Sequence, residues 1–404
     1  MNSLTALGVA ALLARVGFAL YVAGLVRAKN SAGTVLRILC DVCVATLAFW
    51  AVGIAILFQP HNSFFWIERK LLVGITDLPT DAVFFHFAMI LTASGIVCGA
   101  VAERFKFLPL CGASILLAGL IFPVAGHWAW GGWLSAHGFR DLGGATVLHV
   151  SAAVCATVGA IVVGPRGGKF NRDGSSTMIP GHNVPFASFG AMLILVGFIP
   201  YVAGVLMMRP QLGDPSLPGH GALNVLLSAA AAGVGGMILS HFRYRKIDIG
   251  VVLMGFLGGV VASSAAGNLM SSVAAVATGI IAGFLVPWAA IAIDLRLRVD
   301  DPAGVIAVHG VGGAWGTIAI ALFSSAYPIG ARMRLLSWQI IGIVIIAAMS
   351  GLLSATLFIT LKKTVGIRSR EADEFDGLDL AEHDIGAYPD FQQNTIKSYH
   401  LREA

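Results

Sequence analysis

The chain alternates between long apolar runs and short polar connections. A helix needs about 20 apolar residues to cross a hydrocarbon core of about 30 Å. Strict alternation of apolar and polar positions, as in a transmembrane barrel, is not seen in these runs. The pattern therefore predicts an all-α membrane protein with eleven transmembrane helices, at residues 4–26, 34–58, 83–101, 108–126, 143–164, 184–207, 220–241, 250–267, 271–293, 303–323 and 337–361.

The basic residues indicate the orientation of these helices, because cytoplasmic loops are enriched in Lys and Arg. One set of alternate loops holds Arg27, Lys29, Arg104, Lys106, Arg166, Lys169, Arg172, Arg243, Arg245, Lys246, Arg296, Arg298, Lys362 and Lys363. The other set holds only Arg69, Lys70, Arg140, Arg209, Arg332 and Arg334. We therefore expect the N-terminus outside the cell and the C-terminus in the cytoplasm.

Composition agrees with a multi-pass protein of the cell membrane, since 57% of residues are hydrophobic, 12% are charged and the mean hydropathy is +0.83. The net charge of +5 follows from the loops, and no basic groove with interleaved aromatic residues suggests a nucleic-acid partner. The five cysteines lie within the spans and form no ligand set with nearby histidines, so we expect no metal. No spacing brings a nucleophile, a base and an orienting acid together, so we expect neither enzymatic activity nor a cofactor.

Two segments share a polar pattern. In "RDLGGATVLHVSAAVCATVGAIVVG" (140–164), Asp141 precedes His149 by eight positions, and in "DDPAGVIAVHGVGGAWG" (300–316), Asp301 precedes His309 by eight. They begin the fifth and tenth expected spans, which enter the membrane from opposite faces. This arrangement is typical of an inverted repeat with a site near the bilayer midplane.

The spacing predicts where the two histidines lie. Eight helical residues rise about 12 Å, and the midplane lies about 15 Å from either edge of the hydrocarbon. His149 and His309 can therefore meet, share one hydrogen bond and leave a donor and an acceptor for a small polar molecule. The alternative is a self-satisfied polar pair that only joins two helices.

Seven motifs, in order, resemble the ammonium transporter family (Amt/Mep/Rh) over nearly the whole chain. They are "GLVRAKN" (24–30), "GAVAERFKF" (99–107), "HWAWGG" (127–132), "DLGGATVLH" (141–149), "GHNVP" (181–185), "RVDDPAGVIAVHGVGGAWG" (298–316) and "GLDLAEHDIGAY" (377–388). The resemblance implies an eleven-helix protomer with two pseudo-two-fold inverted halves, a homotrimer, and one narrow apolar pore per subunit. It also implies ammonium or ammonia as the ligand and paired histidines at the pore centre.

The resemblance assigns roles at the outer mouth. Trp130 matches the family's aromatic residue there, and a ring face attracts a desolvated cation by about 2 kcal/mol; the alternative is an interfacial tryptophan. Asp141 would favour a cation without touching it, and it can also cap a helix. Asp301 takes the same place in the second half, where a structural cap is at least as good an explanation.

Several positions depart from the family pattern. The outer gate phenylalanine is replaced by Met89, while the aromatic residue one turn earlier is kept as Phe85 and is followed by His86. The second gate ring is Tyr201, and the hydroxyl that helps to bind ammonium is replaced by Val205. Losing one hydrogen bond to a charged ligand costs about 1.5 to 3 kcal/mol, so the outer site should be weakened.

Two functions follow from this mixture. The altered mouth and the tail favour an ammonium sensor that signals through its C-terminus; the alternative is a transporter that conducts ammonium through the twin-histidine pore. We place the transmembrane domain at 1–365 and a cytoplasmic tail at 366–404, with a regulatory or signalling partner or domain at the tail. Asn394 could cap a short helix there.

Two further charges in the apolar runs need explanation. Arg15 stands in the middle of the first run, where it would pair across subunits unless the span is shifted outward. Glu103 and Arg104 end the third span and are expected to form an ion pair that anchors a cytoplasmic helix end.

Overall fold

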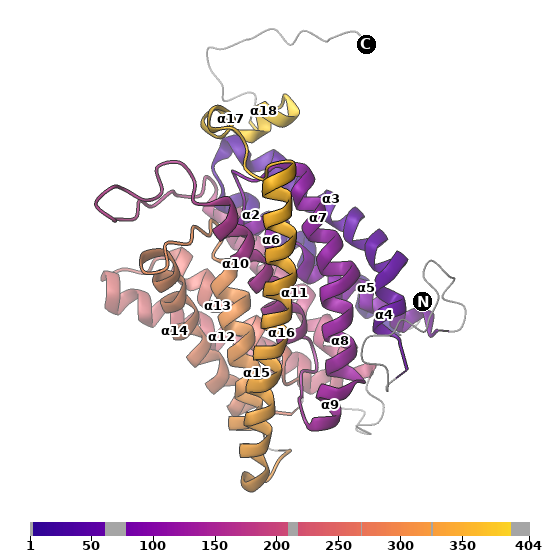
Figure 1. Ribbon diagram of the computed structural model, residues 1–404. Helices are drawn as coiled ribbons and strands as arrows, with labels where there is room; N and C mark the ends of the chain where they lie inside the picture. The colour runs from indigo at the N-terminus through magenta and orange to yellow at the C-terminus, as the bar shows by residue number, and fades with distance from the viewer. Residues whose placement is uncertain (1–2, 61–77, 209–216, 268, 325, 389–404) are drawn as a thin grey trace.

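The computed structural model describes residues 3–60, 78–208, 217–267, 269–324 and 326–388. These residues form a bundle of helices, and β-pairing within them is limited to isolated bridges between single residues. The last two helices lie across one end of the bundle, as Figure 1 shows. We call this end the tail face.

The bundle is built from the following elements: α1 (Ser3–Ala11), α2 (Leu13–Leu25), η1 (Ala28–Asn30), α3 (Ser31–Ala48), η2 (Phe49–Gly53), α4 (Ile54–Leu57), α5 (Thr80–Ser94), α6 (Ile96–Ala100), α7 (Phe107–Leu116), η3 (Leu117–Ile121), α8 (Phe122–Trp130), α9 (Trp133–His137), η4 (Ala145–Val150), α10 (Ser151–Val163), α11 (Val184–Met207), α12 (Leu217–Tyr244), α13 (Ile249–Ser264), α14 (Ser272–Leu295), η6 (Ile306–Val311), α15 (Gly312–Phe323), α16 (Ile329–Thr364), α17 (Glu371–Asp376) and α18 (Leu378–His383).

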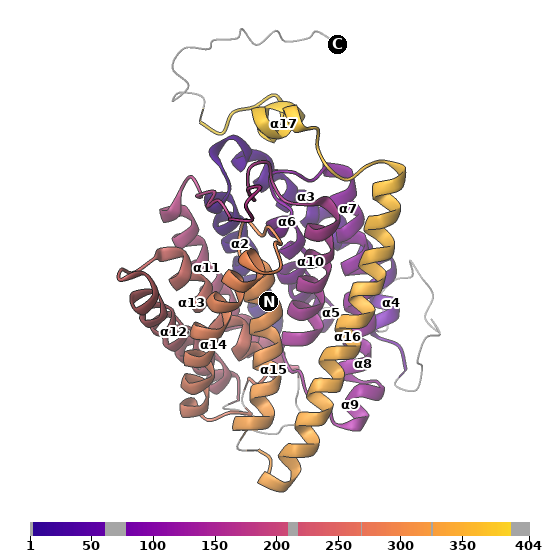
Figure 2. The same ribbon diagram turned by 60° about the vertical axis from the view of Figure 1, so that its left-hand side comes forward.

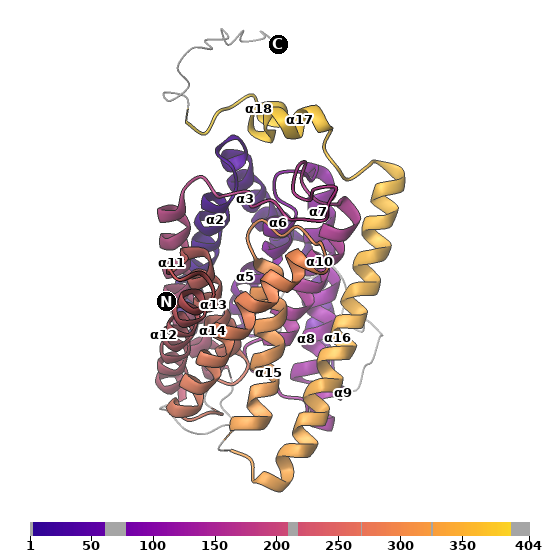
Figure 3. The ribbon, with the colours of Figure 1, turned by 90° about the vertical axis from the view of Figure 1, so that its left-hand side faces the viewer.

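The expected spans agree with the helices in place but not always in length. Within the described residues, ten helical stretches are long and apolar enough to cross a membrane. The eighth expected span, 250–267, is α13, an apolar helix of 16 residues. The last expected span, 337–361, is the core of α16, which has 36 residues and begins at Ile329. In Figures 2 and 3, α16 runs along the outside of the bundle.

Glycines let α2 and α11 approach each other closely. A Cβ atom added at Gly17 would lie 2.6 Å from the Gly190 oxygen, and one at Gly190 would lie 2.3 Å from the Tyr21 nitrogen. One added at Gly197 would lie 2.1 Å from the Ala14 nitrogen. Small residues at helix contacts are how packing replaces the hydrophobic effect inside a bilayer. The first and sixth spans are therefore fixed against each other backbone to backbone.

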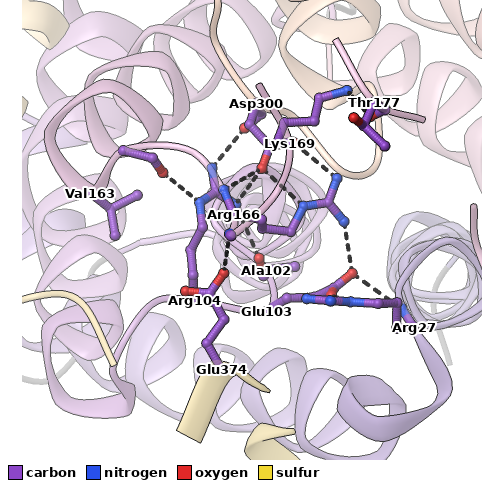
Figure 4. A network of polar contacts seen from close by, with 12 residues as sticks. Arg27, Ala102, Glu103, Arg104, Val163, Arg166, Lys169, Thr177, Asp300 and Glu374 are labelled. Carbon is purple, nitrogen blue, oxygen red and sulfur yellow. Dashed lines mark hydrogen bonds and ion pairs between the residues drawn. The ribbon is translucent and has the colours of Figure 1, made fainter. Parts of the chain in front are cut away.

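A network of ion pairs holds the tail face together (Figure 4). Glu103 pairs with Arg27, and the Arg166 guanidinium lies 2.8 Å from Glu103 and 2.9 Å from Asp300. Burial alone would raise the pKa of Asp300, but hydrogen bonds from Arg166 and the charge of Arg104 outweigh it and hold that pKa below its ordinary value. Glu103 and Arg104 do form ion pairs, as expected, but with these other partners.

The tail is attached through α18. The Asp379 carboxylate accepts hydrogen bonds from the backbone nitrogens of Ala32, at 2.8 Å, and Gly33, at 2.7 Å, at the start of α3. Glu382 forms an ion pair with Arg37 at 2.6 Å. Burial raises the pKa of Asp379 above its ordinary value. The tail thus rests on the second span, and Asn394 lies outside the described residues.

The direction of the spans across the membrane, the pseudo-two-fold relation of the halves and the domain boundary at residue 365 stay predictions. The contacts are of the kind that an inverted repeat would make, since α11 packs on α2 and η6 packs on both η4 and α10. These pairs join the first span to the sixth and the fifth to the tenth.

The glycine crossing can be tested by adding a single methyl group. Gly197→Ala should destabilise the protein by about 1 to 3 kcal/mol, because the new Cβ would overlap backbone atoms of α2 that cannot move aside. Gly219→Ala is the matched control, because a Cβ there meets nothing within 4 Å. We expect the thermal midpoint in detergent to fall by at least about 3 °C for Gly197→Ala only. Equal midpoints for the two variants would contradict the close approach.

Candidate functional site

The two Asp-to-His segments have the same local structure. His149 lies in the π-helical turn η4, and His309 lies in the π-helical turn η6. Each turn follows a glycine in the left-handed region, Gly144 with φ of 82° and Gly304 with φ of 67°, a conformation that other residues rarely adopt. Both glycines stand three positions after the aspartate, a signal that was visible in the sequence.

The aspartates cap these turns. Asp141 accepts hydrogen bonds from the backbone nitrogens of Ala145, Thr146 and Val147 at 2.7, 2.8 and 2.9 Å. Asp301 accepts one from Ile306 at 2.7 Å. Capping, which the sequence analysis gave as one of the roles of each aspartate, is therefore their structural role.

The expected helical rise of about 12 Å between aspartate and histidine is wrong in detail. The four residues from Asp141 to Gly144 precede the helix, and the turn that carries His149 is π-helical rather than α-helical. The histidines nevertheless meet, because both segments have the same irregular geometry. The repeat in the sequence predicted the meeting even though the ideal helix did not describe it.

His149 and His309 face each other at hydrogen-bond distance. Their Nδ1 atoms are 3.0 Å apart, and their rings are nearly parallel, with centroids 5.0 Å apart and planes at 15°. One ring must donate its Nδ1 proton and the other must accept it. Nε2 of His149 is buried and has no partner among the described residues. The pair therefore offers one Nε2–H donor and one Nε2 acceptor.

Three aromatic rings follow one another from His149, each tilted against its neighbour by 30° to 35°. Phe198 lies 5.6 Å from the His149 ring, Tyr201 lies 5.1 Å from Phe198, and Phe85 lies 6.1 Å from Tyr201, all between centroids. The Tyr201 hydroxyl donates to the Gly143 oxygen at 2.7 Å, which fixes its ring. Phe198, one turn before Tyr201, was not identified from the sequence. These rings form an aromatic plug beside the histidine pair.

A small cavity lies beside His309. Its volume is about 20 Å³, and its walls include Phe18, Tyr21, Thr92 and Phe198. A cavity needs a volume of about 10 to 15 Å³, measured as the space open to the centre of a water-sized sphere, to hold one water molecule. Tyr21 also lines a larger cavity of about 500 Å³, and its hydroxyl donates to the Ala303 oxygen at 3.0 Å. The small cavity thus accommodates a molecule the size of water and is separated from the larger one by a fixed ring.

Trp130 lies next to Asp141 and His86. Its indole nitrogen donates to the backbone carbonyl oxygen of Asp141 at 2.6 Å, and the centroid of its ring lies 6.0 Å from that of His86. A cavity of about 350 Å³ beside Trp130 is lined by His86 and His127. His86 donates from Nδ1 to the Ala82 oxygen at 2.7 Å. Of the residues predicted at the outer mouth, Trp130 and His86 therefore share a cavity.

Met89 and Val205 are buried, each with 1% of its surface exposed. Neither lines the cavity beside Trp130. Phe85 and Tyr201 are packed together in the plug, and their role as gate rings stays a prediction. The structure therefore divides the predicted outer residues between the plug and the Trp130 cavity.

Arg15 has its partner within the same chain. It forms an ion pair with Asp41, a buried residue of α3 that the sequence analysis did not single out, and it donates to the Ile38 oxygen at 2.9 Å. Pairing across subunits, one of the two explanations proposed from the sequence, is therefore wrong, and the ion pair accounts for the charge without an outward shift of the first span. The first span is placed as expected, and it carries a charge because the second span neutralises it.

The chain is similar to known membrane proteins over nearly its whole length. The chain matches the Ammonium Transporter Family over residues 4–388. It is 33% identical to Ammonium transporter Amt2 of Archaeoglobus fulgidus, over 93% of this chain and 85% of that protein. It is 32% identical to Putative ammonium transporter 1 of Caenorhabditis elegans, over 92% of this chain and 76% of that protein.

Two solved structures superimpose on nearly the whole of this chain. A protein described as "Sensor Amt Protein" superimposes with a TM-score of 0.89 at 34% identity, covering 94% of this chain and 97% of that one. Mep2 of Candida albicans superimposes with a TM-score of 0.82 at 21% identity, covering 99% and 92%, and this second likeness concerns the fold alone. The chain is an integral membrane protein rather than an enzyme, and it belongs to the ammonium transporter family.

Proposed function

We propose that this protein is an ammonium receptor of the cell membrane, which binds ammonium at His149 and His309 and reports occupancy through its tail. The observation that carries this proposal is the water-sized cavity beside His309, which lies between the Phe198 ring of the plug and the fixed Tyr21 ring. Such a cavity suits a ligand of one heavy atom. We propose that it retains this ligand between the two rings.

The histidine pair can bind either protonation state of the ligand. If His309 donates its Nδ1 proton to His149, its Nε2 lone pair accepts an N–H group of ammonium. If His149 donates instead, His309 presents an Nε2–H group that binds the lone pair of ammonia. When ammonium gives a proton to Nε2 of His309, an N–H bond of the ligand breaks and an Nε2–H bond forms. Neutral ammonia is left, and the positive charge moves to the His309 imidazolium, which delocalises it over the ring and keeps its Nδ1 hydrogen bond to His149.

The outer mouth recruits the cation. The ring face of Trp130 attracts it by about 2 kcal/mol. Asp141 keeps a negative charge nearby while its oxygens remain on the backbone of η4. His86 adds a polar edge to the Trp130 cavity. Met89 and Val205, which do not line that cavity, lack the ring and the hydroxyl of the family pattern. Phe85 and Tyr201 close the path toward the histidines.

The tail is the proposed output. α18 lies on the N-terminus of α3 through Asp379 and Glu382, so it touches the membrane domain directly. With the N-terminus outside and the tail at 366–404 in the cytoplasm, a signalling partner or domain would read its position. We further propose that three copies of the chain assemble, each with two pseudo-two-fold halves of an eleven-helix domain and its own histidine pair.

An ammonium transporter is the second candidate. It is favoured by the cavity of about 500 Å³ on the tail side of Tyr21, which would serve as an exit, and by the names of the relatives. In this case the three rings of the plug would open during each cycle. The two candidates share the binding site and differ in flux.

The first prediction concerns binding. His309→Ala in lipid nanodiscs should weaken ammonium binding by about 10- to 100-fold in calorimetry, because it removes one hydrogen bond to a charged ligand. His137→Ala is the matched control, because His137 is an exposed histidine whose Nδ1 donates to the Trp133 oxygen of its own helix in the part of the chain that the structure describes. Unchanged affinity in His309→Ala would rule out the histidine pair as the site.

The second prediction concerns flux. Wild-type protein on a solid-supported membrane should give an ammonium-evoked current close to background under conditions where calorimetry detects binding. Phe198→Ala should raise this current at least about tenfold, because it removes the ring next to His149 and a barrier of about 1.4 kcal/mol or more. A robust saturable current in the wild-type protein would instead establish the transporter.

A further inference from the structure

The ion pair of Arg15 and Asp41 lies deep inside the membrane domain. Arg15 has 5% and Asp41 has 2% of its surface exposed. The Ser94 hydroxyl donates to Asp41 at 2.6 Å, and the Ser114 hydroxyl donates to its other oxygen. One carboxylate thus joins α2, α3, α5 and α7. Charges placed at this depth are costly and are functional candidates by default.

The guanidinium of Arg15 is held in place, but not all of its N–H groups have hydrogen-bond partners among the described residues. Its Nε and Nη1 atoms are buried and have no partner among the described residues. A Cβ at position 95 would lie 1.7 Å from Nη1, so Gly95 is the residue that leaves room for the side chain. Arg15 therefore has one carboxylate and one carbonyl as its polar anchors, and both belong to α3. A displacement of Arg15 must act on α3 or break the pair.

Arg15 is linked to the histidine cavity through Phe18. The guanidinium carbon lies 5.9 Å from the centre of the Phe18 ring, and that ring lies 6.4 Å from the His309 ring. Phe18 also lines the small cavity. Arg15, Phe18 and Tyr21 are spaced three apart on α2 and share one face. A ligand that displaces Phe18 from the wall of the small cavity therefore displaces the ring that contacts Arg15.

The other end of the pair leads to the tail. Gly33, Arg37 and Asp41 are spaced four apart along α3, so they lie on one face of that helix over about 12 Å. Asp379 of α18 binds the Gly33 nitrogen, and Glu382 of α18 pairs with Arg37. A single helix thus carries Asp41 in the membrane interior and both tail contacts at its start.

We propose that Arg15 and Asp41 are positioning residues of the ammonium response, which transmit occupancy of the His309 cavity through one face of α3 to the tail helix α18. The inference rests on the proposed receptor function and names its internal route. Ligand binding shifts an equilibrium only if it favours one of two arrangements. In this proposal the element with two arrangements is the Arg15–Asp41 pair, which connects Phe18 with α3. Its equilibrium is biased both by the ligand in the His309 cavity and by the tail helix α18.

The test uses the full chain in lipid nanodiscs. Arg15→Gln combined with Asp41→Asn removes both charges, keeps polar atoms at both positions and leaves no unpaired charge in the interior. Arg370→Gln with Asp373→Asn is the matched control, because it neutralises an exposed ion pair of the tail. Ammonium binding is measured by calorimetry, and the response is the ammonium-dependent change in hydrogen exchange of residues 378–383, with sodium chloride as the salt control.

In the wild-type protein and in the control pair we expect binding and a change in exchange. In Arg15→Gln/Asp41→Asn we expect affinity within about threefold of wild type and a response at least about fivefold smaller. The single variant Arg15→Lys, which keeps the positive charge beside Asp41, should retain the response of the wild-type protein. Glu382→Gln, at the far end of the route and partly exposed, should reduce the response without changing affinity.

Three results would overturn the inference. A full response in Arg15→Gln/Asp41→Asn would show that the pair only joins helices. Loss of binding together with the response would place the pair in the binding site rather than on the route from it. A wild-type protein that binds ammonium without any change at α18, or that does not bind it, would refute the receptor function itself, and this result is distinguishable because it does not involve the variants.

Discussion

The site depends on one hydrogen bond between two imidazoles. Because His149 and His309 each use Nδ1 for the other, only their Nε2 atoms remain for a ligand. The aromatic rings on either side, Phe198 and Phe18, have no polar atoms with which to compete. The polar chemistry that the pair offers a ligand is thereby reduced to one donor, one acceptor and the position of one proton, and the capped turns η4 and η6 hold the two rings in place.

The sequence predicted this pair well because its signal is a repeat. The spacing from Asp141 to His149 and from Asp301 to His309 is the same, and two copies of one pattern give the same local structure whatever that structure is. The π-helical turns themselves were not predictable, since apolar periodicity over so few residues does not separate a π turn from an α turn. Phe198 was missed because nothing in an apolar helix distinguishes a ring at the pore from a ring in the core.

Partners across the fold were harder to predict than positions within a span. Arg15 was recognised as anomalous, but Asp41 lies 26 residues away on another helix, and hydropathy does not rank pairs of charges. The same holds for Glu103 and Arg104, which are adjacent in the sequence and were expected to form an ion pair at the helix end. Glu103 pairs instead with Arg27 and Arg166, and Arg104 pairs with Asp300. Electrostatic partners follow tertiary packing, whereas span positions follow from the solvent alone.

The lengths of α13 and α16 differ in a way that matters for the surrounding lipid. α13 has 16 residues, about 24 Å, and packs among α12, α14 and α15, so it meets protein on most of its surface. α16 has 36 residues, about 54 Å, and in its most apolar stretch only 22% of the residues are buried. A helix longer than a hydrocarbon core of about 30 Å must tilt or extend beyond it, so α16 is the element most exposed to hydrophobic mismatch, whereas the short α13 is surrounded by other helices.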